Sequence, residues 1–173
     1  MERQLPSRDN RRILLVEDDG RIINFMQRGL EAEGITLDVV SAKIPALQLT
    51  ESRHYNAIIL DIFLRTDDGL DICRTLRQRS IDTPVLVMTA KDSMELREAS
   101  VTAGANAYLP KPFSFDDLLS TLENMRQAYL TIGKTASTGS PGASLCLNHA
   151  RPMYFPNRGG RNGTETVGMA DDR

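Results

Sequence analysis

Short apolar runs alternate with amphipathic stretches along most of this chain. The runs are three or four residues long and often β-branched, which is typical of buried strands. They are Ile13–Val16, Leu37–Val40, Ala57–Leu60, Val85–Met88 and Ala107–Leu109. Between them, apolar residues recur at helical spacing, as in Ile22, Ile23, Met26 and Leu30. This alternation predicts βαβ units, and therefore an α/β fold with a doubly wound parallel sheet of five strands and helices on both faces.

Local signals mark several helix ends. Gly34 follows the first helical pattern and predicts its end, because glycine readily adopts the left-handed conformation that ends helices. Pro45 stands near the start of the second helix, where a missing N–H costs little. Ser114 and Asp117 form a variant of the capping box and predict the start of the last helix.

The composition changes after Leu130. Of the 43 residues from 131 to 173, 18 are Gly, Pro, Ser or Thr, and the apolar residues show no sustained period. Such a segment cannot bury enough apolar surface to offset the entropy lost on ordering. We therefore predict a domain over residues 11–130 and a tail over 131–173 that is mostly disordered, with Leu145–Phe155 as the only candidate for local order.

The overall composition narrows the class of protein. With 40% hydrophobic residues, 25% charged residues and a net charge of −2, the chain is typical of globular proteins and has no general attraction to nucleic acid. No apolar stretch is long enough for a membrane span, and the polar N-terminus does not resemble a signal peptide. The two cysteines match no metal or redox spacing. We expect a cytoplasmic protein with no membrane partner.

A residue with a charge or a hydroxyl group follows four of the five predicted strands. Glu17 and Asp18 follow the first run, Asp61 the third, Thr89 the fourth, and Lys111 stands just after the last. In an open parallel sheet, ligands bind beyond the carboxyl ends of the strands. The sequence therefore predicts that three acids, a hydroxyl group and an ammonium group converge at one edge of the sheet.

This set of side chains suits phosphoryl chemistry. At a separation of roughly 5 Å and an effective dielectric constant of about 20, each pair of carboxylates repels by roughly 3 kcal/mol. A Mg²⁺ ion would relieve this repulsion, because it binds one or two carboxylates together with phosphate oxygens. Lys111 and Thr89 suit the remaining phosphoryl oxygens. Asp61 lies between these groups in strand order, which makes it the natural nucleophile for an aspartyl phosphate.

The motifs at these positions resemble those of the CheY-like receiver domains of two-component response regulators. The resemblance covers about residues 11–128 and is carried by ILLVEDD (13–19), IILDIFLRTDDG (58–69), VLVMTA (85–90) and AYLPKPF (107–113). The phrase RGLEAEGITLDVV (28–40) is most similar to the OmpR/PhoB subgroup, but the pattern of a complete winged-helix output domain is missing. The resemblance implies a flavodoxin-like (βα)5 receiver fold with strand order 2-1-3-4-5.

The resemblance also implies a role for each site residue. Asp61 would be the phosphoacceptor. The metal site would take Asp18, Asp61, the backbone carbonyl of Phe63 and, through water, Glu17. The cofactor implied is Mg²⁺.

On the other side of the phosphoacceptor, the resemblance implies that Thr89 and Lys111 bind the phosphoryl group and that the Lys111–Pro112 peptide bond is cis. Tyr108 would be an aromatic switch that turns inward when Thr89 moves. The chain would then be a signalling protein, and an enzyme only toward its own phosphorylation and dephosphorylation. Its partners would be a histidine kinase or histidine phosphotransfer protein and a downstream protein target.

Several positions depart from the family pattern. Arg65 replaces the proline that usually follows the phosphoacceptor by four residues, which would loosen that loop. Asn106 and Ala107 stand where the subgroup usually has two aspartates, and Thr121 and Glu123 where its last helix usually carries arginines. Those charges build the subgroup's dimer, so we do not expect that dimer here.

Other functions would need residues that this chain lacks at the corresponding positions. A phosphatase of the haloacid-dehalogenase type needs a second acid two residues after the nucleophile, where this chain has Phe63. A dinucleotide-binding enzyme needs a glycine-rich turn after the first strand, where this chain is acidic. A receiver that folds without being phosphorylated would be expected to lack an acid or the lysine. A truncated or atypical OmpR/PhoB-type DNA-binding transcriptional regulator is the main alternative, although DNA binding by this chain alone is not expected.

Overall fold

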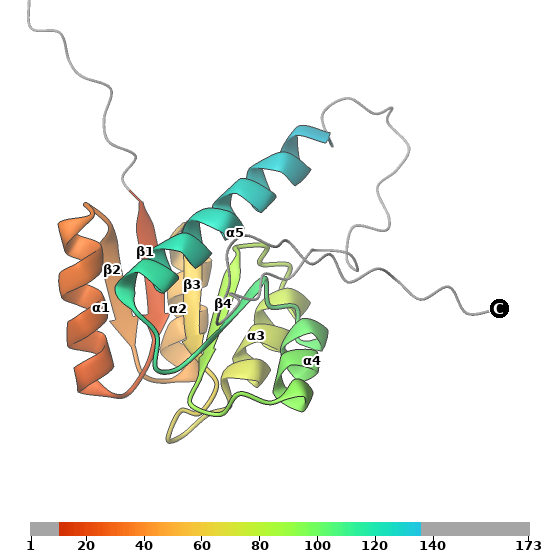
Figure 1. The fold of residues 1–173 in the computed structure, drawn as a ribbon. Helices are drawn as coiled ribbons and strands as arrows, with labels where there is room; N and C mark the ends of the chain where they lie inside the picture. Colours follow the sequence, from red (N-terminus) through yellow and green to blue (C-terminus); the bar gives the residue numbers. More distant parts are fainter. Residues whose placement is uncertain (1–10, 136–173) are drawn as a thin grey trace, which may run out of the picture.

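Parallel strands form a single sheet at the centre of the protein, and helices connect them (Figure 1). The structure is a computed structural model that describes residues 11–135. In chain order its elements are β1 (Arg12–Val16), α1 (Gly20–Ala32), β2 (Thr36–Val40), α2 (Lys43–Ser52), β3 (Ala57–Asp61), α3 (Gly69–Gln78), β4 (Val85–Thr89), α4 (Met94–Thr102), β5 (Ala107–Pro110) and α5 (Phe115–Thr135).

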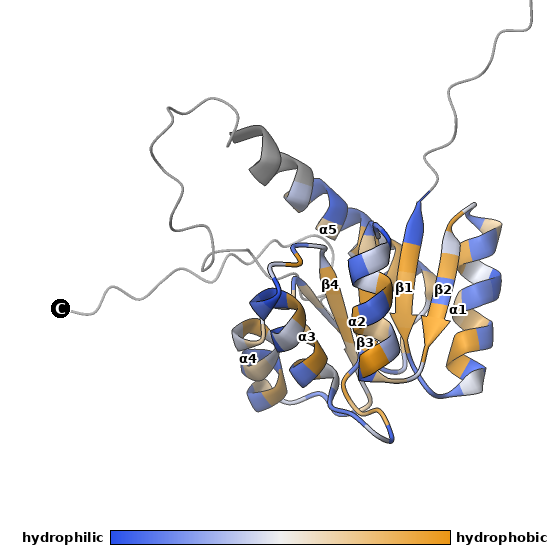
Figure 2. Ribbon diagram, turned by 180° about the vertical axis from the view of Figure 1, so that it is seen from behind, coloured by the Kyte–Doolittle hydropathy of each residue, from blue (hydrophilic) through white to orange (hydrophobic). Residues whose placement is uncertain are grey.

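The sheet has the strand order β2-β1-β3-β4-β5, and each neighbouring pair is parallel. This confirms the predicted fold and its strand order. Each observed strand begins and ends within one residue of the predicted run. The prediction succeeded because strands that are buried on both faces are continuous in apolar residues, and Figure 2 shows these strands as mostly hydrophobic.

Two hydrophobic cores lie on opposite faces of the sheet. Successive strand residues alternate between them, so that Leu14 belongs to one core and Leu15 to the other. One core includes Ala46 and Leu47 of α2 together with the buried face of α3. The other includes buried residues of α1 and α5. The helices thus cover both faces, and the carboxyl ends of the strands lie at one edge of the sheet.

The predicted helix-end signals are present in the structure. Gly34 has a φ of 71°, a conformation that favours glycine, just after α1. The Ser114 backbone N–H donates to Asp117 Oδ2 at 2.9 Å, and the Asp117 N–H donates back to Ser114 Oγ at 3.1 Å. This reciprocal pair is the predicted capping box, and it fixes the start of α5 directly after the segment that carries Lys111.

Two aspartates that precede α3 cap different helices. Asp68 is the N-cap of α3 and accepts from the Leu70 N–H at 2.8 Å. Asp67 instead accepts from the backbone N–H of Lys43 at 3.0 Å, and so caps the first turn of α2. The loop after β3 is therefore tied to the neighbouring helix as well as to its own.

The two α5 positions where the subgroup usually carries arginines differ in their exposure. Thr121 is fully buried, and its hydroxyl donates to the Asp117 carbonyl at 2.7 Å. Thr121 therefore faces the core and adds nothing to the surface of α5. Glu123 does lie at the surface, where it pairs with Arg126 at 2.7 Å. Helix α5 continues to Thr135, five residues beyond the predicted boundary at 130.

The rest of the predicted tail, residues 136–173, lies outside the described residues, and so does Leu145–Phe155. The expectation of disorder there stays a prediction. Among residues 11–135, no helix combines the length and the apolar character that a membrane span requires.

Candidate phosphoacceptor site

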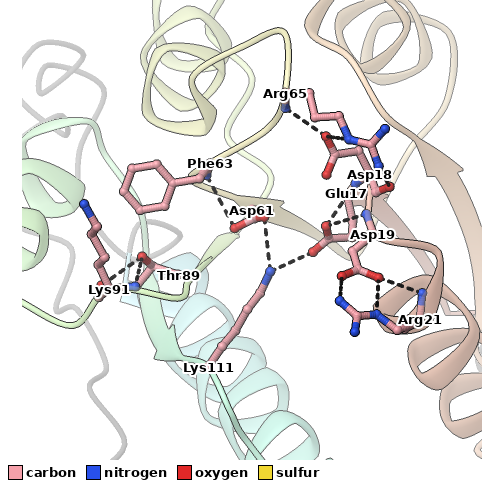
Figure 3. A network of polar contacts seen from close by, with 10 residues as sticks. All are labelled: Glu17, Asp18, Asp19, Arg21, Asp61, Phe63, Arg65, Thr89, Lys91 and Lys111. Atoms are coloured by element: carbon pink, nitrogen blue, oxygen red, sulfur yellow. Dashed lines mark hydrogen bonds and ion pairs between the residues drawn. The ribbon is translucent and has the colours of Figure 1, made fainter.

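The predicted site residues meet at the carboxyl edge of the sheet. Asp61 is the last residue of β3 and Thr89 the last of β4, while Glu17 and Lys111 come directly after β1 and β5. These strands are neighbours in the order β1-β3-β4-β5, so residues far apart in sequence converge. Figure 3 shows them around Asp61.

Three carboxylates form the acidic side of the site. One oxygen from each of Glu17, Asp18 and Asp61 lies within 4.8 Å of the others. The Glu17 side chain is almost completely buried, and its Oε1 accepts from the backbone N–H groups of Asp18 and Asp19 at 3.0 and 2.9 Å. These hydrogen bonds fix the carboxylate at the end of β1.

Lys111 joins the two most buried acids. Its Nζ lies 2.9 Å from Glu17 Oε2 and 3.1 Å from Asp61 Oδ2. The Lys111 backbone N–H donates to the Thr89 carbonyl at 2.7 Å, which fixes the chain beside β4. The peptide bond between Lys111 and Pro112 is cis, as the resemblance implied. The ammonium group is therefore held where it faces the acceptor carboxylate.

The environment of Asp61 disfavours its charged form. Burial raises the pKa of this carboxyl group; the Lys111 ammonium opposes the rise, and the nearby Glu17 carboxylate adds to it. The net pKa is above the ordinary value. A divalent cation beside Asp61 would shift this balance toward the carboxylate, which is the form that acts as a nucleophile.

Asp18 has a partner that the sequence did not predict. Its Oδ2 accepts from the backbone N–H of Arg65 at 2.8 Å and lies 3.5 Å from the Nε of the same residue. The loop after β3 is therefore tied to the loop after β1, whereas the loss of proline at this position was expected to loosen it. The two residues are 47 positions apart, and no periodic signal marks such a contact.

Thr89 is the one predicted phosphoryl ligand whose side chain bonds away from Asp61. Its hydroxyl donates to the Lys91 carbonyl at 2.8 Å and accepts from the Lys91 N–H at 3.1 Å. Tyr108 is fully buried, and its hydroxyl donates to the same carbonyl at 3.1 Å. The aromatic ring is thus already turned inward, and the two proposed switch residues share one acceptor.

Phe63 and Lys91 flank the acceptor on the side opposite the acids (Figure 3). The Phe63 N–H donates to Asp61 Oδ1 at 3.4 Å, and about half of the Phe63 side chain is exposed. The Lys91 Nζ lies 5.8 Å from the centroid of the Phe63 ring. The metal-binding role of the Phe63 carbonyl stays a prediction.

The donor set fits a hard divalent cation. Carboxylate oxygens are the ligands that Mg²⁺ prefers, and three of them within 4.8 Å supply more than the one or two that it usually takes from protein. The cluster contains no imidazole or thiolate group, which are the ligands typical of zinc. The residues present therefore fit Mg²⁺.

Comparison with known proteins agrees with this geometry. The family model for the response regulator receiver domain matches residues 13–123. Response regulator MprA from Mycobacterium ulcerans is 40% identical over 111 residues, which cover 64% of this chain and 48% of the relative; MprA from Mycobacterium sp. (strain KMS) is 39% identical over the same length. The chain thus spans about half the length of the curated relatives it matches.

Solved structures give the same result. The receiver domain of the Francisella response regulator 1452 matches with a TM-score of 0.65 and 31% identity, covering 69% of this chain and 99% of that one. The receiver domain of sensor histidine kinase PA1611 from Pseudomonas aeruginosa matches with a TM-score of 0.63 and 30% identity, covering 68% and 98%. In that protein a magnesium ion is coordinated in the active-site cleft.

Proposed function

Because the chain belongs to the family of response regulator receiver domains, we propose that it takes a phosphoryl group onto Asp61 from a histidine kinase or a histidine phosphotransfer protein. The observation that carries the proposal is the position of the Lys111 ammonium, 3.1 Å from Asp61 and 2.9 Å from Glu17, beside a cluster of three carboxylates. A buried acid, a fixed cation and a site for a divalent metal are what phosphoryl transfer to a carboxylate needs.

The proposed reaction gives each of these residues a role. An Asp61 carboxylate oxygen forms the new bond to phosphorus, the bond from phosphorus to the donor's imidazole nitrogen breaks, and the imidazole takes up a proton as it leaves. Lys111 holds one phosphoryl oxygen and offsets its charge. Thr89, after rotating away from Lys91, donates to another. Mg²⁺, held by Asp18 and Asp61 and through water by Glu17, would neutralise charge on the transferred group.

The test uses a small-molecule phosphodonor. With Mg²⁺ and phosphoramidate, the full chain should gain one phosphoryl group that is stable in acid and labile in base, as read by mass spectrometry. Asp61→Asn should abolish labelling while the circular dichroism spectrum stays that of a folded domain. Asp116→Asn, which removes an acid from the first turn of α5, is the matched control and should label like the wild type. Equal labelling of Asp61→Asn and wild type would overturn the proposal.

For output, we propose that phosphorylation rearranges the Thr89–Tyr108 face for a protein partner. The curated relatives are response regulators, and about half of their length lies outside the match, so what that half does is not carried over to this chain. The alternative is an OmpR/PhoB-type transcriptional regulator. DNA binding by the full chain that appears only after phosphorylation would favour that alternative. A cytoplasmic location and an activity limited to its own phosphorylation and dephosphorylation are parts of the same proposal.

A further inference from the structure

Arg65 occupies one side of the acidic cluster. Its backbone N–H donates to Asp18 Oδ2 at 2.8 Å, its Nε lies 3.5 Å from the same oxygen, and its Nη2 donates to the Asp18 backbone carbonyl at 3.5 Å. Figure 3 shows the guanidinium group folded over Asp18. The Asp18 side chain is only 17% exposed, whereas the Arg65 side chain is 81% exposed. The Arg65 guanidinium group therefore lies on the solvent-facing side of the Asp18 carboxylate.

The three carboxylates of the cluster are paired with two cationic side chains. Lys111 lies between Glu17 and Asp61, and Arg65 lies on Asp18. Each acid of the cluster thus has a positive partner supplied by the chain itself. The two partners differ in how firmly they are held, because the Lys111 side chain is 15% exposed and the Arg65 side chain 81% exposed.

A divalent cation at this cluster would share the Asp18 carboxylate with Arg65. Asp18 offers its carboxylate to the metal, and a guanidinium group within 4 Å of that carboxylate lowers its attraction for a second cation. The exposed arginine can swing into solvent, so it reduces the affinity for the metal without blocking entry.

We propose that Arg65 is an internal competitor of Mg²⁺ for Asp18. The inference rests on the proposed function, because it takes the cluster to be the metal site. Arg65 offsets part of the negative charge of the metal-free site and shifts phosphorylation toward higher Mg²⁺ concentrations. The effect is that of an exposed ion pair, so removal of the charge should tighten Mg²⁺ binding by about two- to five-fold.

The experiment is a calorimetric titration of the full chain with MgCl₂ at fixed ionic strength. Arg65→Gln keeps the backbone N–H and removes the charge, and Arg65→Glu reverses it. The matched control is Arg21→Gln, which removes the same charge from an exposed arginine paired with Asp19, outside the cluster. We expect Mg²⁺ affinity to rise from wild type to Arg65→Gln and again to Arg65→Glu, with a smaller change for Arg21→Gln.

Salt gives a second readout that a purely structural role would not produce. Because Arg65 is exposed, its competition is screened, and the difference between wild type and Arg65→Gln should shrink at high ionic strength. If wild type binds Mg²⁺ and Arg65→Gln binds no more tightly than Arg21→Gln, this inference is wrong and the proposed function stands. If wild type binds no Mg²⁺ at millimolar concentrations, the proposed metal site fails and this inference fails with it.

Discussion

The hydroxyl groups of Thr89 and Tyr108 donate to the same acceptor, the backbone carbonyl oxygen of Lys91, at 2.8 and 3.1 Å. Thr89 closes β4, Tyr108 lies in β5, and the shared carbonyl belongs to the loop between β4 and α4. A rotation of Thr89 toward a phosphoryl group on Asp61 would give up its bond to this carbonyl. The loop would then be held by Tyr108, which couples the acceptor site to the surface near α4.

This coupling predicts that Thr89 transmits phosphorylation to the loop. In wild type, the NMR resonances of Lys91 and Tyr108 should shift when Asp61 is phosphorylated or carries beryllofluoride. In Thr89→Ala these shifts should be much reduced, because the hydroxyl that links the two sites is gone. Thr102→Ala, which removes an exposed hydroxyl from α4, should respond like wild type. Shifts of equal size in Thr89→Ala would contradict the coupling.

The Tyr108 hydroxyl should also contribute to stability. Tyr108→Phe keeps the buried ring and removes the donor to Lys91, so the free energy of unfolding should fall by about 1 kcal/mol, the usual net value of one hydrogen bond. Urea denaturation measures it. If the variant is as stable as wild type, the hydrogen bond from Tyr108 to the Lys91 carbonyl adds no net stability.

Gly69 allows α3 to begin against the acceptor strand. A Cβ at this position would lie 2.0 Å from the Asp61 carbonyl oxygen and 2.9 Å from the Ile62 Cα, both of which are backbone atoms that cannot rotate away. Gly69→Ala should therefore lower the free energy of unfolding by about 2–3 kcal/mol. It should also slow phosphorylation, because the relief of the clash moves Asp61.

The matched control is Gly20→Ala, at the start of α1, where a Cβ would meet nothing within 4 Å. Alanine is the better helix former, so this variant should be as stable as wild type or slightly more stable. Urea denaturation and phosphoramidate labelling would be compared in both variants. A Gly69→Ala protein that matches Gly20→Ala in both measurements would show that the close approach can relax at no cost.

The sequence was sufficient to predict the sheet and the convergence of the site. Both follow from one physical rule, since buried parallel strands are continuous in apolar residues and their carboxyl ends meet at one edge. Asp61 was placed correctly because it directly follows such a run, and Lys111 because it stands one residue beyond another. The capping box at Ser114 and the glycine stop at Gly34 were also predictable, because their causes lie within a few residues of chain.

What the sequence could not show depends on contacts between distant loops. The bond from Arg65 to Asp18 and the capping of α2 by Asp67 join residues that share no repeat or spacing. The burial of Thr121 depends on which side of α5 faces the sheet. The direction of the Thr89 hydroxyl depends on a loop carbonyl, which a sequence pattern does not locate.

Tyr55 should make the fold sensitive to alkali. Its hydroxyl donates to Asp38 Oδ2 at 2.7 Å, and burial together with this hydrogen bond to a carboxylate raises the pKa of Tyr55 to about 12 from an ordinary 10. A raised pKa means that the folded state favours the neutral phenol. This stability is fully present below pH 10 and is lost as the pH rises toward 12.

Tyr55→Phe should therefore flatten the fall in stability across that pH window, because phenylalanine does not ionise. At neutral pH it should cost about 1–2 kcal/mol, since the hydroxyl bonds to a charged group. Urea denaturation at a series of pH values checks both effects. If wild type and Tyr55→Phe lose stability in parallel between pH 10 and 12, the alkaline loss comes from other groups.

The side chains at positions 63 and 91 lead us to predict slow hydrolysis of the phosphorylated Asp61. They flank Asp61 as a ring and a cation 5.8 Å apart, and neither presents a carboxylate or an amide that could orient a water molecule for attack on phosphorus. We predict that the side chains at these two positions control that water. Replacing Phe63 with Asn and Lys91 with Glu should shorten the lifetime of the phosphorylated protein by about tenfold. This is less than the full effect of an evolved general base.

The lifetime would be measured as the decay of acid-quenched phosphoprotein after removal of the donor, in excess Mg²⁺. The single variants Phe63→Asn and Lys91→Glu serve as controls. Each should shorten the lifetime by less than the pair does, because the amide and the carboxylate must hold the same water molecule. Unchanged or slower hydrolysis in the double variant would show that some other feature of the site, such as access of water past Arg65, sets the rate.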